Sequence, residues 1–285
     1  MKGIILAAGK GTRMYPMTLP VCKPLIPVYD KPLIYYPLAV LMQAGIRDIL
    51  IIVPMDEMYP FVKLLSDGSE LGLNLSYRVQ KVQRGIADAF IIGKSFIGDD
   101  DVCLVLGDNI FYGDGLSTCL AEAKKNISGA TVFGYRVEDP RPFGVVEFDG
   151  DGKALSIEEK PKNPKSNYIV PGLYFYDNSV VDIAAGLKPS ARGELEITGV
   201  NSAYLEQGRL SVVKLGGDTV WRDAGNADSL LESAETIRRL QCKTGRQVAC
   251  LEEIAYKMGY ISREQMLELG REMEKTDYGK YILSL

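Results

Sequence analysis

The chain has 285 residues, of which 46% are hydrophobic and 25% are charged, and its formal net charge is −4. This composition is typical of a soluble globular protein, and the length allows one large α/β domain or two smaller ones. A net acidic chain argues against a nucleic-acid-binding protein, whose binding surface is normally basic. No apolar run is long enough to cross a bilayer, so neither nucleic acid nor a membrane is an expected partner.

The cysteine and histidine content limits the chemistry that this chain can perform. Five cysteines are scattered without metal-ligand spacing, and histidine is absent. We interpret the cysteines as reduced thiols of a cytoplasmic protein, since Lys2 leads directly into an apolar strand and no signal peptide is recognisable. The lack of histidine removes the usual general base and the Ser-His and Cys-His nucleophile pairs. Any reaction must therefore rely on carboxylates, lysines, arginines and backbone dipoles.

The first predicted strand, residues 3–6, runs into a loop of small residues with two cations, Ala7-Ala-Gly-Lys-Gly-Thr-Arg13. Such a loop allows a phosphate to approach backbone N–H groups, and the guanidinium of Arg13 can add planar donors. Neither the Walker A loop nor the Rossmann glycine fingerprint fits, because Met14 stands where each requires a glycine. The segment is also compatible with an ordinary strand-to-helix turn.

The first half of the chain then alternates between predicted helices and strands. Helices are predicted over residues 32–44, 59–65 and 86–96, and strands over residues 49–53, 73–79 and 102–106. This alternation indicates a layered, mostly parallel, Rossmann-like α/β sheet flanked by helices. Ligands of such sheets bind at the carboxyl ends of the strands, so the loop 7–13 and Asp108 are expected to face one cleft.

The second half is less regular. Strands are predicted over residues 130–135, 144–148 and 174–175, and helices over residues 180–187, 195–207 and 227–240. From residue 241 the pattern is helical and charged, with apolar positions at Ile254, Met258, Ile261, Met266 and Leu269. We therefore expect a catalytic domain over residues 1–240, followed by a helical C-terminal subdomain, residues 241–285, that packs on the core or on a neighbouring subunit.

Several polar residues outside the first loop could carry chemistry. Asp108 and Asp223 can hold Mg²⁺ against phosphate oxygens, although each could equally be a turn or cap residue. Glu159 and Lys160 end a predicted strand, where a solvated charge cluster is the alternative. Arg192 precedes glutamates that suit a helix N-terminus, which leaves its guanidinium available for an anion.

These segments together resemble the sugar nucleotidyltransferases, and the resemblance runs nearly from end to end. The segments that carry it are 6–13, 23–32, 105–113, 159–161, 172–177 and 191–198. The block Asp30-Lys-Pro-Leu-Ile-Tyr-Tyr-Pro37 and the tail segments 249–255 and 278–281 resemble, more narrowly, the members that act on dTTP. The resemblance implies a Mg²⁺-assisted reaction in which dTTP and α-D-glucose 1-phosphate give dTDP-glucose and pyrophosphate, the opening step of dTDP-L-rhamnose synthesis.

The resemblance also implies roles for individual positions. The nucleotide would be bound by Leu6, Ala8, Gly9, Gly11, Thr12, Arg13, Gln80, Gly85 and Asp108, with Gln80 and Gly85 at the thymine edge. The metal ligands would be Asp108 and Asp223. The sugar phosphate would be bound by Gly144, Glu159, Lys160, Val170 and Arg192. The residues with catalytic roles would be Arg13, Lys23 and Lys160. Because the sugar phosphate is already an ionised nucleophile, positioning and electrostatics can carry the reaction without a base.

The chain departs from the family pattern at a few positions, namely Pro24, Phe143, Gly199, Ala224 and Asn226. The resemblance further implies a homotetramer and a second nucleotide site between subunits for feedback inhibition. Basic residues of that second site align here with Gly217, Gln247 and Lys257.

Two other functions stay open from the sequence. The first is a uridylyl- or cytidylyltransferase that acts on another hexose 1-phosphate, because one or two base contacts decide nucleotide choice. The second is a non-catalytic sugar-nucleotide sensor on the same fold. The presence of Arg13, Lys23, Asp108 and Asp223 favours an enzyme over a sensor.

Overall fold

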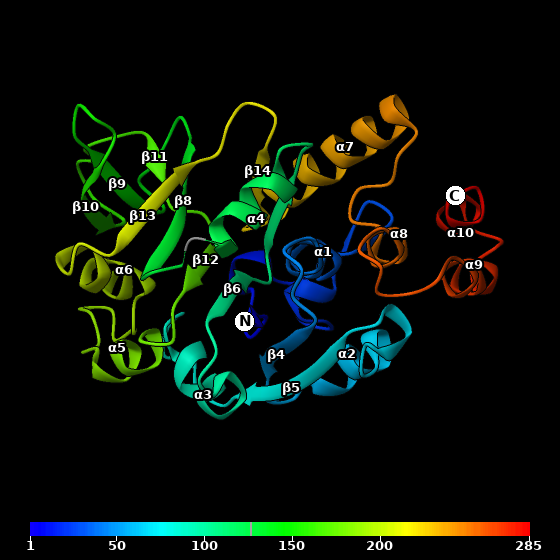
Figure 1. Ribbon diagram of the computed structural model, residues 1–285, viewed down its shortest axis with the longest axis horizontal. Coiled ribbons are helices and arrows are strands. Elements are labelled where there is room, and N and C mark those ends of the chain that lie inside the picture. Colours follow the sequence, from blue (N-terminus) through cyan, green and yellow to red (C-terminus); the bar gives the residue numbers. More distant parts are fainter. Residues whose placement is uncertain (126) are drawn as a thin grey trace.

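A computed structural model describes residues 1–125 and 127–285, and a ten-stranded mixed sheet lies at its centre (Figure 1). Nine strands follow the order β10-β9-β11-β8-β12-β6-β1-β4-β5, and β13 pairs with β8 beside this path. The strands of this sheet are β1 (Lys2–Leu6), β4 (Asp48–Pro54), β5 (Asn74–Gln80), β6 (Val102–Leu106), β8 (Ala130–Arg136), β9 (Gly144–Phe148), β10 (Ala154–Glu159), β11 (Tyr168–Ile169), β12 (Leu173–Tyr176) and β13 (Leu210–Lys214).

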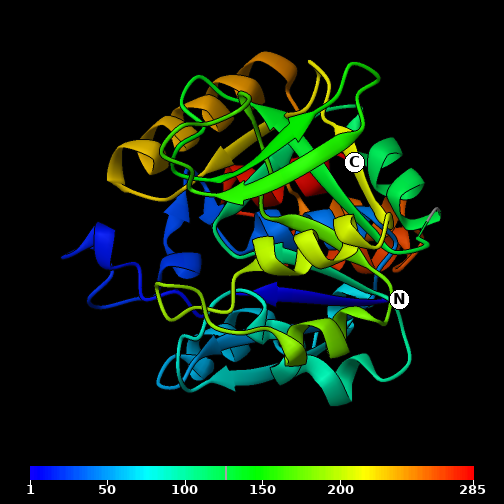
Figure 2. The ribbon, with the colours of Figure 1, turned by 90° about the vertical axis from the view of Figure 1, so that its left-hand side faces the viewer.

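Helices cover both faces of the sheet, as the two views in Figures 1 and 2 show. They are α1 (Tyr35–Gln43), α2 (Met58–Leu65), α3 (Asp88–Ile97), α4 (Leu116–Lys125), α5 (Val180–Gly186), α6 (Ile197–Glu206), α7 (Ala227–Thr244), α8 (Leu251–Lys257), α9 (Arg263–Glu272) and α10 (Asp277–Leu283). One apolar core contains residues of α1, α2, α4 and α8 to α10, and the other contains residues of α3, α5 and α6. The predicted layered α/β fold is therefore confirmed.

The parallel part of the sheet explains the position of the first loop. β1 pairs in parallel with β4 and with β6, and β4 pairs in parallel with β5. Successive residues of β1 face opposite cores, with Ile4 in one and Ile5 in the other. A strand that is covered on both faces must be apolar throughout, as Gly3–Leu6 is. The carboxyl ends of β1 and β6 consequently meet, and Gly107 donates its N–H to the carbonyl of Leu6 at 2.9 Å.

The second half of the chain makes the sheet mixed. β12 is antiparallel to both β6 and β8, and β9, β10 and β11 add further antiparallel pairs. Two additional short pairs lie outside the main sheet: β2 (Pro27–Val28) with β3 (Lys31–Pro32), and β7 (Asn109–Tyr112) with β14 (Val220–Asp223). The parallel pairing predicted from the alternating pattern thus holds mainly for the first half.

Some predicted boundaries were wrong. The helix expected over residues 32–44 begins only at Tyr35, because Lys31 and Pro32 form the β2–β3 hairpin instead. No segment was predicted for α4, nor for the strands β2, β3, β7, β11, β13 and β14. In the C-terminal region, Ile254, Ile261 and Met266 are buried as expected, whereas Met258 is 39% exposed at the end of α8.

The C-terminal helices pack at the side of the molecule opposite to β9, β10 and β11 (Figure 1). α7 spans residue 240 without a break, and α8 contacts α1. All five cysteines, which lie within the described residues, are free thiols. Among the helices of residues 1–125 and 127–285, none combines the length and the apolar character that a membrane span requires.

Candidate active site

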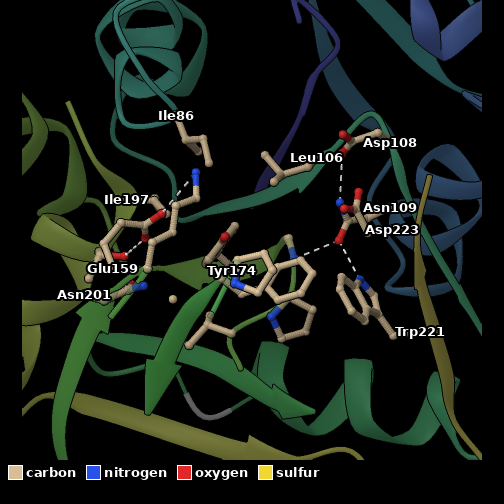
Figure 3. A pocket seen from close by; sticks show the side chains of 18 of the residues that line it. Ile86, Leu106, Asp108, Asn109, Glu159, Tyr174, Ile197, Asn201, Trp221 and Asp223 are labelled. Carbon is tan, nitrogen blue, oxygen red and sulfur yellow. Dashed lines mark hydrogen bonds and ion pairs between the residues drawn. The ribbon is translucent and has the colours of Figure 1, made fainter. Parts of the chain in front are cut away.

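A cavity of about 590 Å³ opens where β6, β7, β10, β12, β14 and α6 converge, and Figure 3 shows it from close by. Asp108, Asn109, Trp221 and Asp223 lie at one end, and Glu159, Ile197 and Asn201 lie at the other. The lining residues include Arg13, Ile86, Leu106, Asp108, Asn109, Phe143, Gly144, Glu159, Lys160, Val170, Tyr174, Thr198, Asn201, Trp221 and Asp223. The cavity therefore joins an acidic and aromatic end to a polar end.

A smaller pocket of about 210 Å³ adjoins this cavity and shares three lining residues with it, Ile86, Leu106 and Asp108. It is also lined by Leu6, Gly9 and Lys23. The loop after β1 therefore borders the same site as Asp108, as the topology predicted.

The conformation of this loop depends on one glycine. Gly11 has φ of +62°, and a Cβ there would lie 2.9 Å from the Cγ2 of Thr18. The hydroxyl of Thr18 donates to the carbonyl of Gly11 at 2.7 Å, and a short 3₁₀ turn over Thr12–Met14 follows. Gly9 has open space around its Cα, so a bound group can approach the backbone there. Ala8, Gly11 and Thr12 do not line either cavity.

Lys23 and Asp108 form an ion pair between the two cavities. The Nζ of Lys23 lies 2.6 Å from Oδ2 of Asp108, and the Lys23 side chain is only 7% exposed. Burial alone would raise the pKa of Asp108, but the Lys23 charge and hydrogen bonds from Lys23 and Asn109 outweigh it and lower that pKa. Asp108 thus stays ionised and presents its carboxylate to the cavity.

Asn109 orients Asp108 through the other carboxylate oxygen. Its side-chain oxygen accepts from the indole N–H of Trp221 at 2.6 Å and from the backbone N–H of Gly172 at 2.9 Å. Its amide nitrogen is then left to donate to Oδ1 of Asp108, at 2.8 Å. Asn109 and Trp221 were not among the predicted site residues, although Asn109 follows Asp108 directly and Trp221 lies two positions before Asp223.

Asp223 reaches the same end of the cavity from β14. The antiparallel register places it opposite Asn109, and Ala224 donates its N–H to the carbonyl of Asp108 at 3.1 Å. Burial and the nearby charge of Asp108 raise the pKa of Asp223 to about 6, although Lys23 and Arg13 lower it. Two carboxylates that face one another in this way form a favourable site for an added cation.

These residues fit a Mg²⁺ ion. The chain offers two converging carboxylates, and Mg²⁺ usually binds to one or two carboxylates with phosphates and water completing its shell. Within residues 1–125 and 127–285 no group of three or more metal-binding side chains is found. A dedicated all-protein metal cage is therefore absent from that part of the chain, whereas a site completed by phosphate oxygens is compatible with it.

The opposite end of the cavity carries hydrogen-bonding groups. The hydroxyl of Thr198 donates to Oε2 of Glu159 at 2.5 Å, and a Cβ at Gly144 would lie 3.4 Å from the same carboxylate oxygen. Lys160, with φ of +46°, holds a backbone conformation that is uncommon outside glycine and is often found at functional sites. Its ammonium lies 3.9 Å from Oε1 of Glu159.

Arg192 is close to this end without lining the cavity. Its guanidinium donates to Oε1 of Glu196 at 2.8 Å and to Oε1 of Glu159 at 3.4 Å. This guanidinium was expected to be available for an anion, but in this structure its Nε and Nη2 groups donate to carboxylates.

Gln80 and Gly85 also lie outside the lining of both cavities. Gln80 is the last residue of β5 and is buried, and its amide nitrogen donates to Oδ2 of Asp88 at 2.9 Å. Gly85 passes so close to Leu195 that a Cβ would lie 2.5 Å from the Leu195 carbonyl oxygen. Of the predicted site residues, the structure therefore brings ten together around the cavities: Leu6, Gly9, Arg13, Lys23, Asp108, Gly144, Glu159, Lys160, Val170 and Asp223.

Comparison with known proteins identifies the family of this chain. Residues 2–239 match the family model "Nucleotidyl transferase". Glucose-1-phosphate thymidylyltransferases of Neisseria meningitidis and Mycobacterium tuberculosis are each 55% identical to this chain over 285 residues, which is 100% of this chain and 99% of each relative.

Solved structures show the same fold. One is of a Bacillus anthracis protein assigned as a glucose-1-phosphate thymidylyltransferase, in complex with sucrose. It has 43% identity and a TM-score of 0.78, covering 84% of this chain and 95% of that chain. A UDP-glucose pyrophosphorylase complexed with UDP-glucose has 23% identity and a TM-score of 0.74, covering 84% of this chain and 98% of that chain, and shows a shared fold alone. This chain therefore belongs to the nucleotidyl transferase family and, within it, to the glucose-1-phosphate thymidylyltransferases.

Proposed function

We propose that this protein transfers the thymidylyl group of dTTP to α-D-glucose 1-phosphate, releasing pyrophosphate and forming dTDP-glucose. The observation that carries the proposal is the cavity that joins the Lys23, Asp108 and Asp223 cluster to the polar end at Glu159 and Lys160. One end suits a polyphosphate with its cation, and the other suits hydroxyl groups and a phosphate. The glucose-1-phosphate thymidylyltransferases that are 55% identical to this chain over its full length support the assignment.

The main obstacle to this reaction is the repulsion between two polyanions. Arg13 and Lys23 border the cavities on the side of the glycine loop, so they would offset the charge of the triphosphate and of the departing pyrophosphate. A bound Mg²⁺ would neutralise phosphate charge, and Asp108 and Asp223 would hold it. The sugar phosphate is already an anion near neutral pH, so the chain needs no general base, which agrees with its lack of histidine.

At the other end, we assign Gly144, Glu159 and Val170 to the glucose, and Lys160 to its phosphate. Glu159 accepts from Thr198 and retains acceptor capacity for sugar hydroxyls. Arg192 would join Lys160 on the phosphate by exchanging its glutamate partners for phosphate oxygens. The loop residues Leu6, Ala8, Gly9, Gly11 and Thr12 would hold the nucleotide, with Gln80 and Gly85 at the base.

Further proposals concern the organisation of the protein. We assign residues 1–240 to catalysis and residues 241–285 to a helical extension, and we propose a homotetramer that acts in the cytoplasm. The mass of the purified protein in solution, measured by light scattering, tests the tetramer. A dimer or a monomer would contradict it.

The test of the activity is a panel of nucleoside triphosphates against hexose 1-phosphates, with pyrophosphate release as the readout. We expect dTTP with glucose 1-phosphate to give the highest kcat/KM, and Asp108→Asn to abolish release. A preference for UTP, CTP or another sugar would identify a different nucleotidyltransferase. Binding of dTTP without pyrophosphate release from any hexose 1-phosphate would identify a sensor.

A further inference from the structure

A buried carboxylate holds the side-chain amide of Gln80. Asp88 is 1% exposed, and its Oδ2 accepts from Nε2 of Gln80 at 2.9 Å. Its other oxygen, Oδ1, accepts from the guanidinium of Arg84 at 2.7 Å. Within residues 1–125 and 127–285, no donor is found for Oε1 of Gln80, and that oxygen is not among the fully buried, unpartnered atoms. The oxygen of the amide therefore remains available to a ligand.

The carboxylate decides which way the amide faces. A glutamine amide can rotate by 180° and exchange its oxygen and its NH₂ group with little change in shape. An ionised carboxylate offers only acceptors, so it accepts the NH₂ group and repels the amide oxygen. While Asp88 occupies its present position, one of the two orientations of Gln80 is strongly disfavoured.

The carboxylate is itself held rigidly. Asp88 is the first residue of α3, and the segment before it is clamped to Leu195 by two backbone hydrogen bonds. Leu195 donates its N–H to the carbonyl of Arg84 at 2.5 Å, and its own carbonyl accepts from the N–H of Ala87 at 3.1 Å. Gly85, with φ of +108°, allows this close approach of the two chains.

We propose that Asp88 is a positioning residue for nucleobase selection, acting by locking the Gln80 amide in the orientation that reads the imide edge of thymine or uracil. This inference rests on the proposed function, because it takes Gln80 as the residue that faces the base. Arg84 supports the lock by charge and by its hydrogen bond to the second carboxylate oxygen.

The two orientations of the amide suit different bases. Thymine and uracil present the N3–H donor next to the O4 acceptor, whereas cytosine presents the N3 acceptor next to the N4 amino donor. A glutamine whose oxygen faces N3 and whose NH₂ faces position 4 therefore pairs with thymine or uracil. The rotated amide pairs with cytosine. A fixed amide discriminates between these edges, and a freely rotating amide reads both.

The test compares Asp88→Asn with the wild type. Asparagine keeps the shape of aspartate but can both donate and accept, so it permits either orientation of Gln80. The readout is kcat/KM for dTTP, dUTP and dCTP with glucose 1-phosphate. We expect the dTTP/dCTP ratio to fall about tenfold, the size expected when a mismatched hydrogen bond is relieved. The dTTP/dUTP ratio should stay constant, because both bases share the imide edge.

Three further variants serve as controls or as a replacement for Asp88→Asn. Asp88→Glu keeps an acceptor-only side chain and should preserve the dTTP/dCTP ratio even where overall activity falls. Asp277→Asn makes the same chemical change at an exposed ion pair with Lys280 and should alter no ratio. Asp88→Ser also offers both a donor and an acceptor, so it repeats the test in a smaller side chain if Asp88→Asn does not fold.

A fall of more than fivefold in the dTTP/dCTP ratio of kcat/KM, seen in Asp88→Asn and Asp88→Ser but not in the other variants, supports the positioning role of Asp88. A dTTP/dCTP ratio that stays within fivefold of the wild type, or a dTTP/dUTP ratio that falls with it, overturns it. Failure of the wild type to use dTTP with any hexose 1-phosphate would instead contradict the proposed function, so the two failures are distinguishable.

Discussion

At the scale of single residues, the chemistry of the site depends on amides and charges that hold the two aspartates. Asn109 connects three segments that are distant in the sequence, because its amide contacts Asp108, Trp221 and Gly172. The side-chain oxygen of Asn109 accepts from two buried groups, and these two bonds fix the direction of its NH₂ group toward Asp108. Groups that orient a metal ligand typically contribute 10- to 100-fold to affinity or activity.

Asn109→Asp should therefore lower kcat/KM by about 10- to 100-fold. The new carboxylate cannot donate to Asp108, and it places a second negative charge beside Oδ1 of that residue. Steady-state pyrophosphate release measures the effect. Asn74→Asp is the matched control, because the Asn74 amide also donates to an aspartate, Asp48, at 2.8 Å, but on an exposed surface. An equal loss of activity in both variants would contradict a role of Asn109 in orienting Asp108.

Asp223 links activity to stability through its charge. Its pKa of about 6 in the folded protein lies above the ordinary value of 3.8. A raised carboxyl pKa contributes stability that is fully present below pH 3.8 and is lost as the pH rises through about 6, so the ionised group destabilises the metal-free fold at pH 8.

Asp223→Asn should therefore stabilise the metal-free protein at pH 8 by about 2 kcal/mol, allowing for solvent screening, while it removes activity. Near pH 4 the gain should disappear, because the native carboxyl group is then largely protonated. Urea unfolding in the presence of a chelator at the two pH values measures this. Asp139→Asn, at an exposed carboxylate paired with Arg141, should show no gain. Equal stability of Asp223→Asn and the wild type at pH 8 would refute the prediction.

Much of this site could be predicted from the sequence, since residues such as Gly9, Arg13 and Asp108 lie in segments that resemble a known family. Asn109 and Trp221 were missed for a physical reason. Their importance comes from hydrogen bonds between residues 112 positions apart, and no local pattern encodes that contact. The hydrogen bond from Arg192 to Glu159 likewise spans 33 positions, whereas its bond to Glu196, four positions away, is a local pairing that the sequence contains.

At the scale of elements, a helix or strand was predicted accurately when its local composition determines it, and poorly when it depends on contacts with distant segments. Strand β6 was predicted to the residue, because a segment buried on both faces must be apolar throughout. Strand β14 has four residues and exists through its pairing with β7, more than 100 positions earlier, so nothing in its local composition marks it. The start of α1 was misplaced because the β2–β3 hairpin uses Lys31 and Pro32.

The clamp between the segment before α3 and Leu195 gives a prediction at this scale. Gly85→Ala would place a Cβ 2.5 Å from the Leu195 carbonyl oxygen at a φ of +108°. We expect it to lower the free energy of unfolding by about 3 kcal/mol, through strain and a lost backbone contact.

Gly208→Ala is the matched control for this substitution. Gly208 also has a positive φ, +68°, but has no atom within 4 Å of a Cβ, so its substitution should cost only about 1 kcal/mol. Urea unfolding of both variants measures the difference. Equal costs would show that the contact with Leu195 does not constrain the chain.

At the scale of the whole molecule, the C-terminal helices are joined to the core by buried polar groups as well as by apolar packing. Glu252 and Glu253 are both buried in α8, and each accepts from a tyrosine hydroxyl of α10. Lys31, also buried, donates to Asp30 of the β2–β3 hairpin and to Gln241 of α7. The Nζ of Lys31 also lies 5.4 Å from the centre of the Tyr278 ring, so α10 contacts the hairpin, and the Gln241 bond links the hairpin to α7. Burial lowers the pKa of Lys31, although the Asp30 charge opposes this shift.

Removal of one of the two tyrosine hydroxyls should show how strongly α10 is joined to α8. Tyr278→Phe takes away the 2.6 Å hydrogen bond to Glu252. Among residues 1–125 and 127–285, the side-chain donor that this buried carboxylate then keeps is the Cys250 thiol, a weak donor. We expect a loss of about 2 kcal/mol in the free energy of unfolding, with kcat unchanged. In Tyr281→Phe the loss should be smaller, because Glu253 keeps its bond from Lys257. Urea unfolding and pyrophosphate release measure the two effects. Equal destabilisation by both variants would show that the buried carboxylates do not depend on their remaining donors.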